Sequence, residues 1–141
     1  MVKTFDPKQC IITYGGVQLS GFADGTFLSI VPNAESFTRV VGADGEVARN
    51  KSNDSTYNLT MTFLASSASN DYLSTVYLAD KVSNSGSLPF TVADLSGTTV
   101  FFTESCWIQQ APDVEFAKEI TERAWALQTG QADEYFIGGN N

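Results

Sequence analysis

Pairs of carboxylates are the side chains in this sequence whose types and spacing could support chemistry. Three pairs occur, Asp44 with Glu46, Asp113 with Glu115, and Asp133 with Glu134. Glycoside hydrolysis uses two carboxyl groups that flank the scissile bond, and calcium prefers carboxylate oxygens. Each pair also lies beside a predicted turn, where solvated carboxylates are the ordinary outcome. A calcium- or carbohydrate-related β-sandwich is therefore only a remote alternative.

The rest of the usual catalytic chemistry is missing from the sequence. There is no histidine, which removes the commonest general base, the Ser-His-Asp triad and the commonest zinc ligand. Cys10 and Cys106 are the only cysteines and lie far apart, so we expect two free thiols. Neither a Walker A motif nor a GxGxxG motif is present. We predict that the protein is no enzyme and needs no metal or cofactor.

Composition favours one folded domain over residues 1–141. The apolar fraction of 43% and the aromatic fraction of 12% exclude wholesale disorder. No apolar run approaches the roughly 20 residues of a membrane span, so we expect no membrane anchor. The first residues, MVKTFDPKQC, lack the apolar segment of a signal peptide, which predicts folding in the cytoplasm.

The net charge of -8 limits the partners. A protein that binds nucleic acid through its phosphates needs a basic surface, and 16 acidic against 8 basic residues leave none to spare. The acidity can simply confer solubility. It can also keep phosphate backbones from adhering to a surface that they must pass. Composition alone does not separate these two interpretations.

The clearest element is a strand over residues 56–64. Tyr57, Leu59, Met61 and Phe63 fall on one side of it, and threonines and Asn58 fall on the other. This period of two predicts a half-buried strand. Before it, we expect a short strand over residues 37–41. An Asp-Gly turn signal follows this strand, and a charged, polar segment follows the turn. We predict a long extended hairpin arm over about 40–55.

The remaining segments are short strands and one helix. Strands are expected over 10–14, 17–20, 26–31, 88–95, 98–108 and the end of 119–129, with an edge strand over 133–137. One helix is expected over about 69–81, with Ser67 or Ser69 as its N-cap. The fold class is therefore mainly β, a β-sandwich or barrel-like core with one α-helix. Five aromatic side chains could stack on nucleic-acid bases if they were exposed, but no basic residues alternate with them, so we expect them to pack in that core: Phe101, Phe102, Trp107, Phe116 and Trp125.

Several segments, taken in order, resemble the tube protein of contractile-tailed bacteriophages. They are KTFDPKQCIITYGGVQLSGFADGTF, ESFTRVVGADGEVARNKSNDS, ASSASNDYLS, DLSGTTVFF and VEFAKEITERAW. Each segment alone is weak evidence, but the set in register spans nearly the whole chain. The resemblance implies a structural role in which hexameric rings stack into a hollow tube that conducts the genome. The inner tube of a tail-derived device, such as a contractile bacteriocin or a secretion system, is the alternative.

The resemblance also implies partners and a place. The partners are further copies of the chain, the sheath protein, the tape measure, the baseplate, the tail terminator and passing DNA that is not bound specifically. The place is the virion tail, after assembly in the host cytoplasm. The resemblance implies no catalytic residues, because proteins of this family have none that could be assigned to positions of this sequence.

Two sets of charged residues are candidates for these contacts. The mixed charges of the arm suit pairing between subunits, which fixes register more than it adds affinity: Arg39, Asp44, Glu46, Arg49, Lys51 and Asp54. A solvated hairpin without a partner is the alternative. An acidic channel would repel DNA phosphates, and its candidate lining is Asp44, Glu46, Asp94, Glu104 and Asp133. The threonine side of residues 56–64 faces either the channel or a neighbouring subunit.

Overall fold

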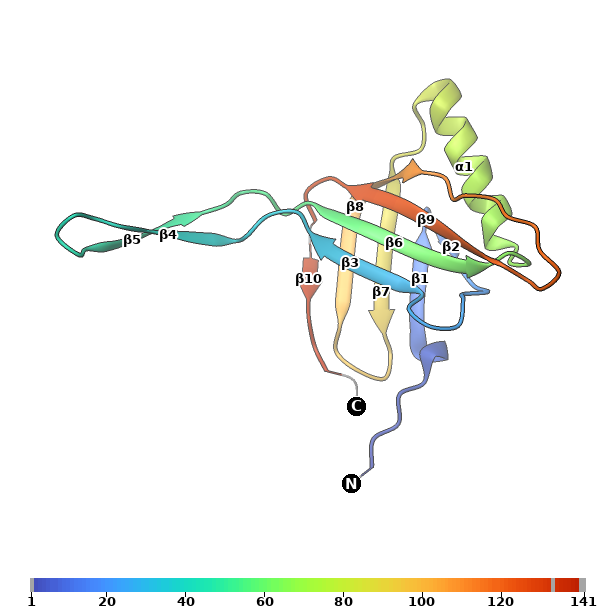
Figure 1. The fold of residues 1–141 in the computed structure, drawn as a ribbon, viewed down its shortest axis with the longest axis horizontal. Coiled ribbons are helices and arrows are strands. Elements are labelled where there is room, and N and C mark those ends of the chain that lie inside the picture. The colour runs from blue at the N-terminus through green and yellow to red at the C-terminus, as the bar shows by residue number, and fades with distance from the viewer. Residues whose placement is uncertain (1, 133, 140–141) are drawn as a thin grey trace.

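The computed structural model describes residues 2–132 and 134–139, and Figure 1 shows a β-rich body from which one hairpin projects. A 3-10 turn, η1 (Pro7–Gln9), precedes the strands. The elements that follow are β1 (Cys10–Tyr14), β2 (Val17–Gln18), β3 (Leu28–Pro32), β4 (Phe37–Val41), β5 (Val47–Lys51), β6 (Tyr57–Leu64), α1 (Ser69–Ser83), β7 (Leu88–Asp94), β8 (Val100–Gln110), β9 (Glu122–Thr129) and β10 (Glu134–Phe136). The mainly β class with one α-helix is confirmed within the described residues.

The body is one antiparallel sheet folded into two layers. Its strand order is β2-β1-β7-β8-β9-β6-β3, and β10 pairs with β8 beside that path. The long strand β8 belongs to both layers, because its first half pairs with β7 and β10 and its last residues pair with β9. The register shifts where β8 changes partners, as is usual where a strand turns from one layer into another. In Figure 1 the strands of the front layer, β3, β6 and β9, cross those behind them.

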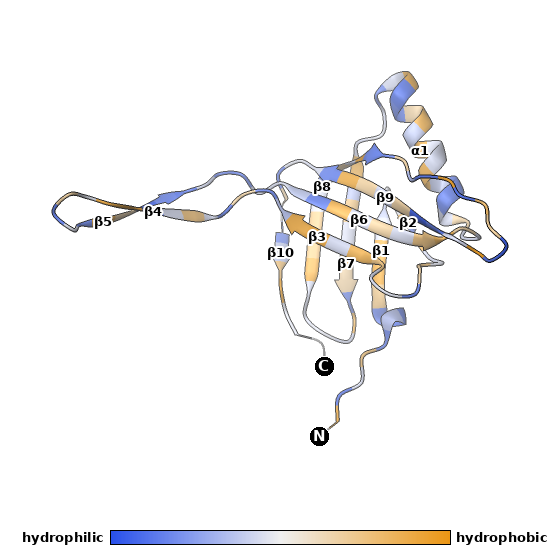
Figure 2. Ribbon diagram, in the orientation of Figure 1, coloured by the Kyte–Doolittle hydropathy of each residue, from blue (hydrophilic) through white to orange (hydrophobic). Residues whose placement is uncertain are grey.

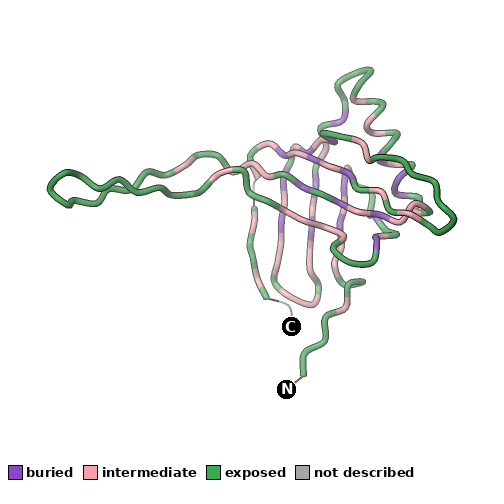
Figure 3. The backbone as a smooth tube through the Cα atoms, in the orientation of Figure 1, coloured by how far each residue is buried: buried purple, intermediate pink, exposed green. Residues whose placement is uncertain are grey.

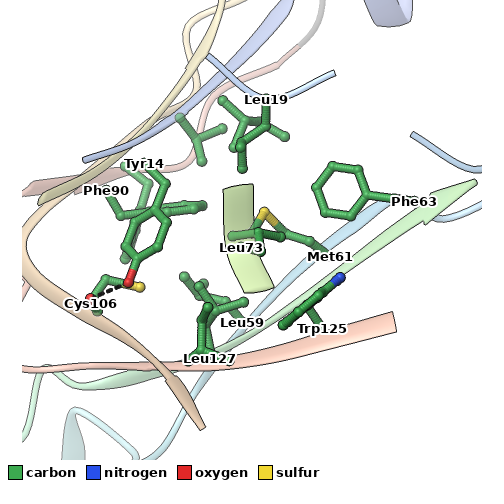
Figure 4. Close-up of a cluster of buried hydrophobic side chains, with 14 residues drawn as sticks. Tyr14, Leu19, Leu59, Met61, Phe63, Leu73, Phe90, Cys106, Trp125 and Leu127 are labelled. Carbon is green, nitrogen blue, oxygen red and sulfur yellow. Dashed lines mark hydrogen bonds between the residues drawn. The ribbon is translucent and has the colours of Figure 1, made fainter. Parts of the chain in front are cut away.

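The core lies between the two layers and is built by alternating side chains. Strand β6 contributes Leu59, Met61 and Phe63, which are at most 1% exposed. The facing layer contributes apolar side chains from β1, β7 and β8, and β9 closes the core (Figure 4): Ile12, Tyr14, Phe90, Val92, Phe101, Cys106, Ile108, Trp125 and Leu127. Figure 2 shows the same alternation of apolar and polar residues along the strands. The predicted face of residues 56–64 is therefore confirmed.

Helix α1 packs against the body through one turn of side chains. Leu73 is fully buried in the core, and the Tyr72 hydroxyl donates to the Tyr14 carbonyl oxygen at 2.9 Å. The helix extends two residues beyond the predicted end, and Asn84 closes it in the left-handed conformation with a φ of 57°. No helix among the described residues is long and apolar enough to cross a membrane.

The predicted N-cap of this helix was wrong. The N-cap position is Ala68, which has no side chain that can hydrogen-bond. The two serines beside it are held by the loop before β3: Ser67 Oγ donates to the Ser20 carbonyl oxygen at 2.6 Å, and Ser69 Oγ accepts from Ser20 N–H at 2.9 Å. Ser67 Oγ also accepts from Ser69 N–H at 3.2 Å, so a local bond and the contacts with the loop before β3 together hold the start of the helix.

Candidate functional site

The β4–β5 arm is a hairpin that the body does not cover. Its strands pair only with each other, as a separate two-stranded sheet. All ten of their residues are exposed (Figure 3), and Figure 1 shows the hairpin extending well beyond the body. The predicted arm is confirmed as an extended hairpin, and its first strand has the bounds predicted for the short strand over residues 37–41. It thus presents both of its faces to solvent.

One face of the arm combines apolar and cationic side chains. Cross-strand partners share a face in an antiparallel pair, and the pairs here are Phe37 with Lys51, Arg39 with Arg49 and Val41 with Val47. We call these six residues the cationic face. The Arg49 guanidinium lies 4.3 Å from the centre of the Phe37 ring, a cation–π contact. Phe37, Val41 and Val47 nevertheless stay exposed.

The central pair of this face is unfavourable within the isolated chain. Arg39 and Arg49 lie directly opposite each other, and like charges at such positions repel. Neither arginine forms an ion pair with any of the described residues. A carboxylate from outside the arm would relieve the repulsion, so the pair is suited to an acidic partner.

The tip of the arm is acidic and tightly turned. Gly42 N–H donates to the Glu46 carbonyl oxygen at 2.7 Å, and Gly45 takes a φ of 87°, which its lack of a Cβ permits. The Asp44 carboxylate accepts from Glu46 N–H at 3.1 Å. The predicted Asp-Gly turn is confirmed, and the turn places the two carboxylates together at the far end of the arm.

The root of the arm is fixed to the body by a polar network that the sequence did not reveal. Gln131 Oε1 accepts from Ser55 N–H at 2.7 Å and also from the Ser55 hydroxyl. Gln131 Nε2 donates to the Asn53 carbonyl oxygen at 3.0 Å. On the other side, Asn33 Nδ2 donates to Thr56 Oγ1 at 2.9 Å. Nothing in the local pattern around Gln131 indicates this role, since its partners lie more than 70 positions away.

Asp54 belongs to this root. Its carboxylate accepts from Thr56 N–H at 2.9 Å and from the Thr56 hydroxyl. These hydrogen bonds, the hydroxyl bond foremost, lower the pKa of Asp54 below its usual value. Asp54 therefore shapes the turn at the root. Its bonds to Thr56 lie next to the start of β6, where the arm joins the body.

The predicted channel-lining carboxylates are dispersed over the molecule. Asp44 and Glu46 share the arm tip, and Glu104 is exposed on β8. Asp94 ends β7, where its carboxylate accepts from Ser96 N–H at 3.1 Å. Asp133 lies outside the described residues. Among the four that are described, the fold brings together only the first two.

A broad face of the front layer carries no cation. The outward side chains of β3, β6 and β9 are in register, with Thr60 between Ser29 and Ala126, and Thr62 opposite Ala124. We call this surface the threonine face: Ser29, Val31, Asn58, Thr60, Thr62, Ala124, Ala126 and Gln128. A polyanion could move along this surface without being bound, because the side chains are small and uncharged.

The loop between β8 and β9, residues 111–121, is a second projecting segment. Three large apolar side chains on it are exposed, Val114 at 57%, Phe116 at 90% and Ile120 at 60%. The expectation that Phe116 packs in the core was wrong, although Phe101 and Trp125 do lie there. The Arg123 guanidinium lies 5.9 Å from the centre of the Phe116 ring. Carboxylates of the loop and of β9 line a hollow of about 370 Å³ at its base, together with Thr60, Ala124 and Ala126 of the threonine face.

The buried polar groups serve the fold. The Tyr14 hydroxyl donates to the carbonyl oxygens of Gly86, at 2.8 Å, and Cys106, at 2.9 Å, and burial raises the pKa of the phenol. Burial also raises the pKa of the Cys106 thiol. Cys10 and Cys106 are both free thiols, as expected. Within the described ranges no three acidic or cysteine side chains group so as to hold a metal ion.

Comparison with known proteins connects this geometry to one family. A family profile described as the bacteriophage PhiTE tail tube protein matches residues 10–137. Structural protein ORF10 of Pseudomonas phage KPP10 is 27% identical over 132 residues, which cover 88% of this chain and 76% of that protein. The matched residues include the arm, the helix and both layers of the body.

Solved structures share the fold at low sequence identity. The tube-terminating cap of the anti-feeding prophage has a TM-score of 0.65 at 10% identity, covering 100% of this chain and 94% of that one. A chain of the PVC sheath-tube complex, from an extracellular contractile injection system, has a TM-score of 0.57 at 13% identity and covers 98% and 93%. A chain of the PVC sheath/tube terminator has the same TM-score at 12% identity and covers 98% of both chains. At these identities the likeness shows the fold alone.

Proposed function

The chain belongs to the bacteriophage PhiTE tail tube protein family, and from this premise we propose how its copies form and use a tube. It is a structural protein of the phage tail. In the proposed assembly, hexameric rings stack into a hollow tube that conducts the genome during infection. The rings form in the host cytoplasm before the tail is completed.

The exposed arm is the observation that carries this proposal. Two-stranded hairpins are marginally stable alone, and this one exposes Phe37, Val41 and Val47 while it holds two arginines face to face. A neighbouring subunit would bury the apolar side chains and neutralise the arginines. The arm is therefore the element that joins one subunit to the next, and its charged residues set the register of the contact. These are Arg39, Asp44, Glu46, Arg49, Lys51 and Asp54.

The threonine face is the proposed channel lining. DNA slides past a wall that offers its phosphates no cation, and the chain as a whole carries a net charge of -8. The face is broad, and its uncharged side chains are small. Asp94, Glu104 and Asp133 are also proposed as acidic residues of the channel, although Asp94 and Glu104 lie on β7 and β8 and not on the strands of the threonine face. Asp44 and Glu46 reach a channel only if the arm tip of a neighbouring ring lies there.

A tube of this kind would contact further tail proteins. The proposed ones are the sheath protein outside it, the tape measure within it, the baseplate below and the tail terminator above. Similar folds occur in a sheath-tube complex and in tube terminators or caps, which supports contacts of these kinds. Catalysis has no place in this proposal.

Electron microscopy of the purified protein at high concentration tests the proposal. We expect rings about the size of a hexamer and, with time, hollow tubes. Protein that stays strictly monomeric under all conditions, together with its absence from purified virions, would overturn the proposal. The matched control is a core-destabilised variant, which should form neither product because it does not fold.

A second candidate is the inner tube of a tail-derived contractile device. Its support is the fold shared with an extracellular contractile injection system and with the anti-feeding prophage. The two candidates differ in whether DNA passes through the tube. Genes for a capsid and for DNA packaging next to this gene would favour the phage tail, and their absence would favour the device.

A further inference from the structure

The cationic face of the arm is an anomaly in an acidic chain. Strands β4 and β5 hold three of the chain's 8 basic residues and no carboxylate. The same face exposes Phe37, Val41 and Val47. A partner surface should therefore offer carboxylates together with exposed apolar side chains.

The loop at residues 111–121 has this composition. Asp113, Glu115 and Glu119 lie on it and Glu122 follows at once, against a single lysine, Lys118. Its exposed apolar side chains alternate with these charges, since Val114 and Phe116 flank Glu115. The loop keeps a defined course, because Thr121 Oγ1 donates to the Glu115 carbonyl oxygen at 2.9 Å. The two surfaces are complementary in charge and in apolar character.

Their placement excludes contact within one chain. Figure 1 shows the arm at one end of the long axis of the molecule and the loop between β8 and β9 at the other. A contact between different surfaces on two copies is heterologous, and such contacts repeat from copy to copy until a ring closes or a helical array forms. The complementary ends thus suit a repeating assembly.

We propose that the cationic face of the β4–β5 arm docks on the 111–121 loop of a second copy of this chain. In the complex Arg39 and Arg49 meet Asp113 and Glu115, which removes the repulsion between the arginines. The valines of the arm cover the apolar side chains of the loop. This inference rests on the proposed function, because it names the partner surface of the arm in the tube.

Charge reversal on each side tests the docking. The arm variant is Arg39→Glu with Arg49→Glu, and the loop variant is Asp113→Lys with Glu115→Lys. Each alone should raise the critical concentration for rings and tubes by about tenfold or more, because attractive close pairs become repulsive. The two sets combined in one chain should restore assembly to nearly that of the unmodified protein. Sedimentation velocity and electron microscopy measure the assembled fraction.

The controls separate a failure of docking from other failures. Asp24→Lys with Glu134→Lys changes the net charge as the loop variant does, at exposed positions elsewhere, and should assemble normally. All variants should melt as the unmodified chain does, because the changed side chains are exposed and touch no core residue.

Each outcome decides one question. Unmodified protein that never assembles overturns the proposed function itself. Assembly of the unmodified chain and of both reversal variants leaves the tube standing and overturns the docking. If the arm variant fails to assemble and the loop variant assembles normally, the arm binds another surface, and the docking is overturned. Failure of the combined variant to regain assembly also overturns it.

Discussion

The body and the arm are both antiparallel β-structure, yet different forces hold them. Strand β6 pairs on both edges, with β3 and β9, and half of its side chains lie in the core. Strands β4 and β5 pair only with each other and bury none of their residues. The body is thus stabilised by burial, whereas the arm is held by its ladder and by the polar network at its root. The arm therefore adds little to the stability of its own subunit.

The comparison predicts that removing the arm has the largest effect on assembly and almost none on folding. Deletion of Gly42 to Ser52 should leave a folded monomer, since all the removed residues except the half-buried Ser52 are exposed. Tube growth should be abolished. Circular dichroism melting checks the fold, and electron microscopy checks the tubes. Normal polymerisation of the shortened protein would show that the arm is not the assembly element.

Truncation of a core side chain should instead lower the stability of the fold. Phe63 is fully buried and stacks on Phe22 with ring centroids 4.8 Å apart. Phe63→Ala should lower the free energy of unfolding by about 3–5 kcal/mol, because it leaves a cavity as well as losing buried area. Val47→Ala in the arm should change it by less than about 0.5 kcal/mol. Chemical denaturation of the monomers measures both. Equal losses would contradict the division between body and arm.

The sequence predicted buried strands better than exposed side chains for a physical reason. A strand with one buried face must alternate, so the period in residues 56–64 predicted both the strand and its core side. Exposed apolar residues leave no such pattern, and Phe116 was assigned to the core although it is 90% exposed. The Gln131 network escaped prediction because it joins segments that only the folded chain brings together. Of the apolar side chains on the cationic face, only Val47 lies in the segment that was predicted to be charged and polar.

Removal of a buried hydrogen bond in the body should lower the free energy of unfolding by less than the core truncation does. Trp125 Nε1 donates to Asn70 Oδ1 at 3.0 Å, and this bond links β9 to the first turn of α1. Asn70→Ala should cost about 1–3 kcal/mol of the free energy of unfolding, because a buried indole N–H loses its partner. The double variant with Trp125→Phe removes both partners, so the loss should be less than the sum of the two single losses. Additive losses in denaturant melts would show that the pair is not coupled.

The substitution with the smallest expected effect lies at the exposed root of the arm. Thr56→Val removes the hydroxyl that donates to the Asp54 carboxylate, so the pKa of Asp54 should rise toward the usual value for aspartate. The pKa in the folded chain lies below the unfolded one, so the bonds stabilise the root above the unfolded pKa. That stabilisation is lost as the pH falls through the lower, folded value. NMR titration of the Asp54 carboxyl carbon measures the shift, with Asp24 as an exposed reference. An unchanged titration in Thr56→Val would mean that the hydroxyl does not hold the carboxylate, and that the Thr56 N–H is the donor that lowers the pKa of Asp54.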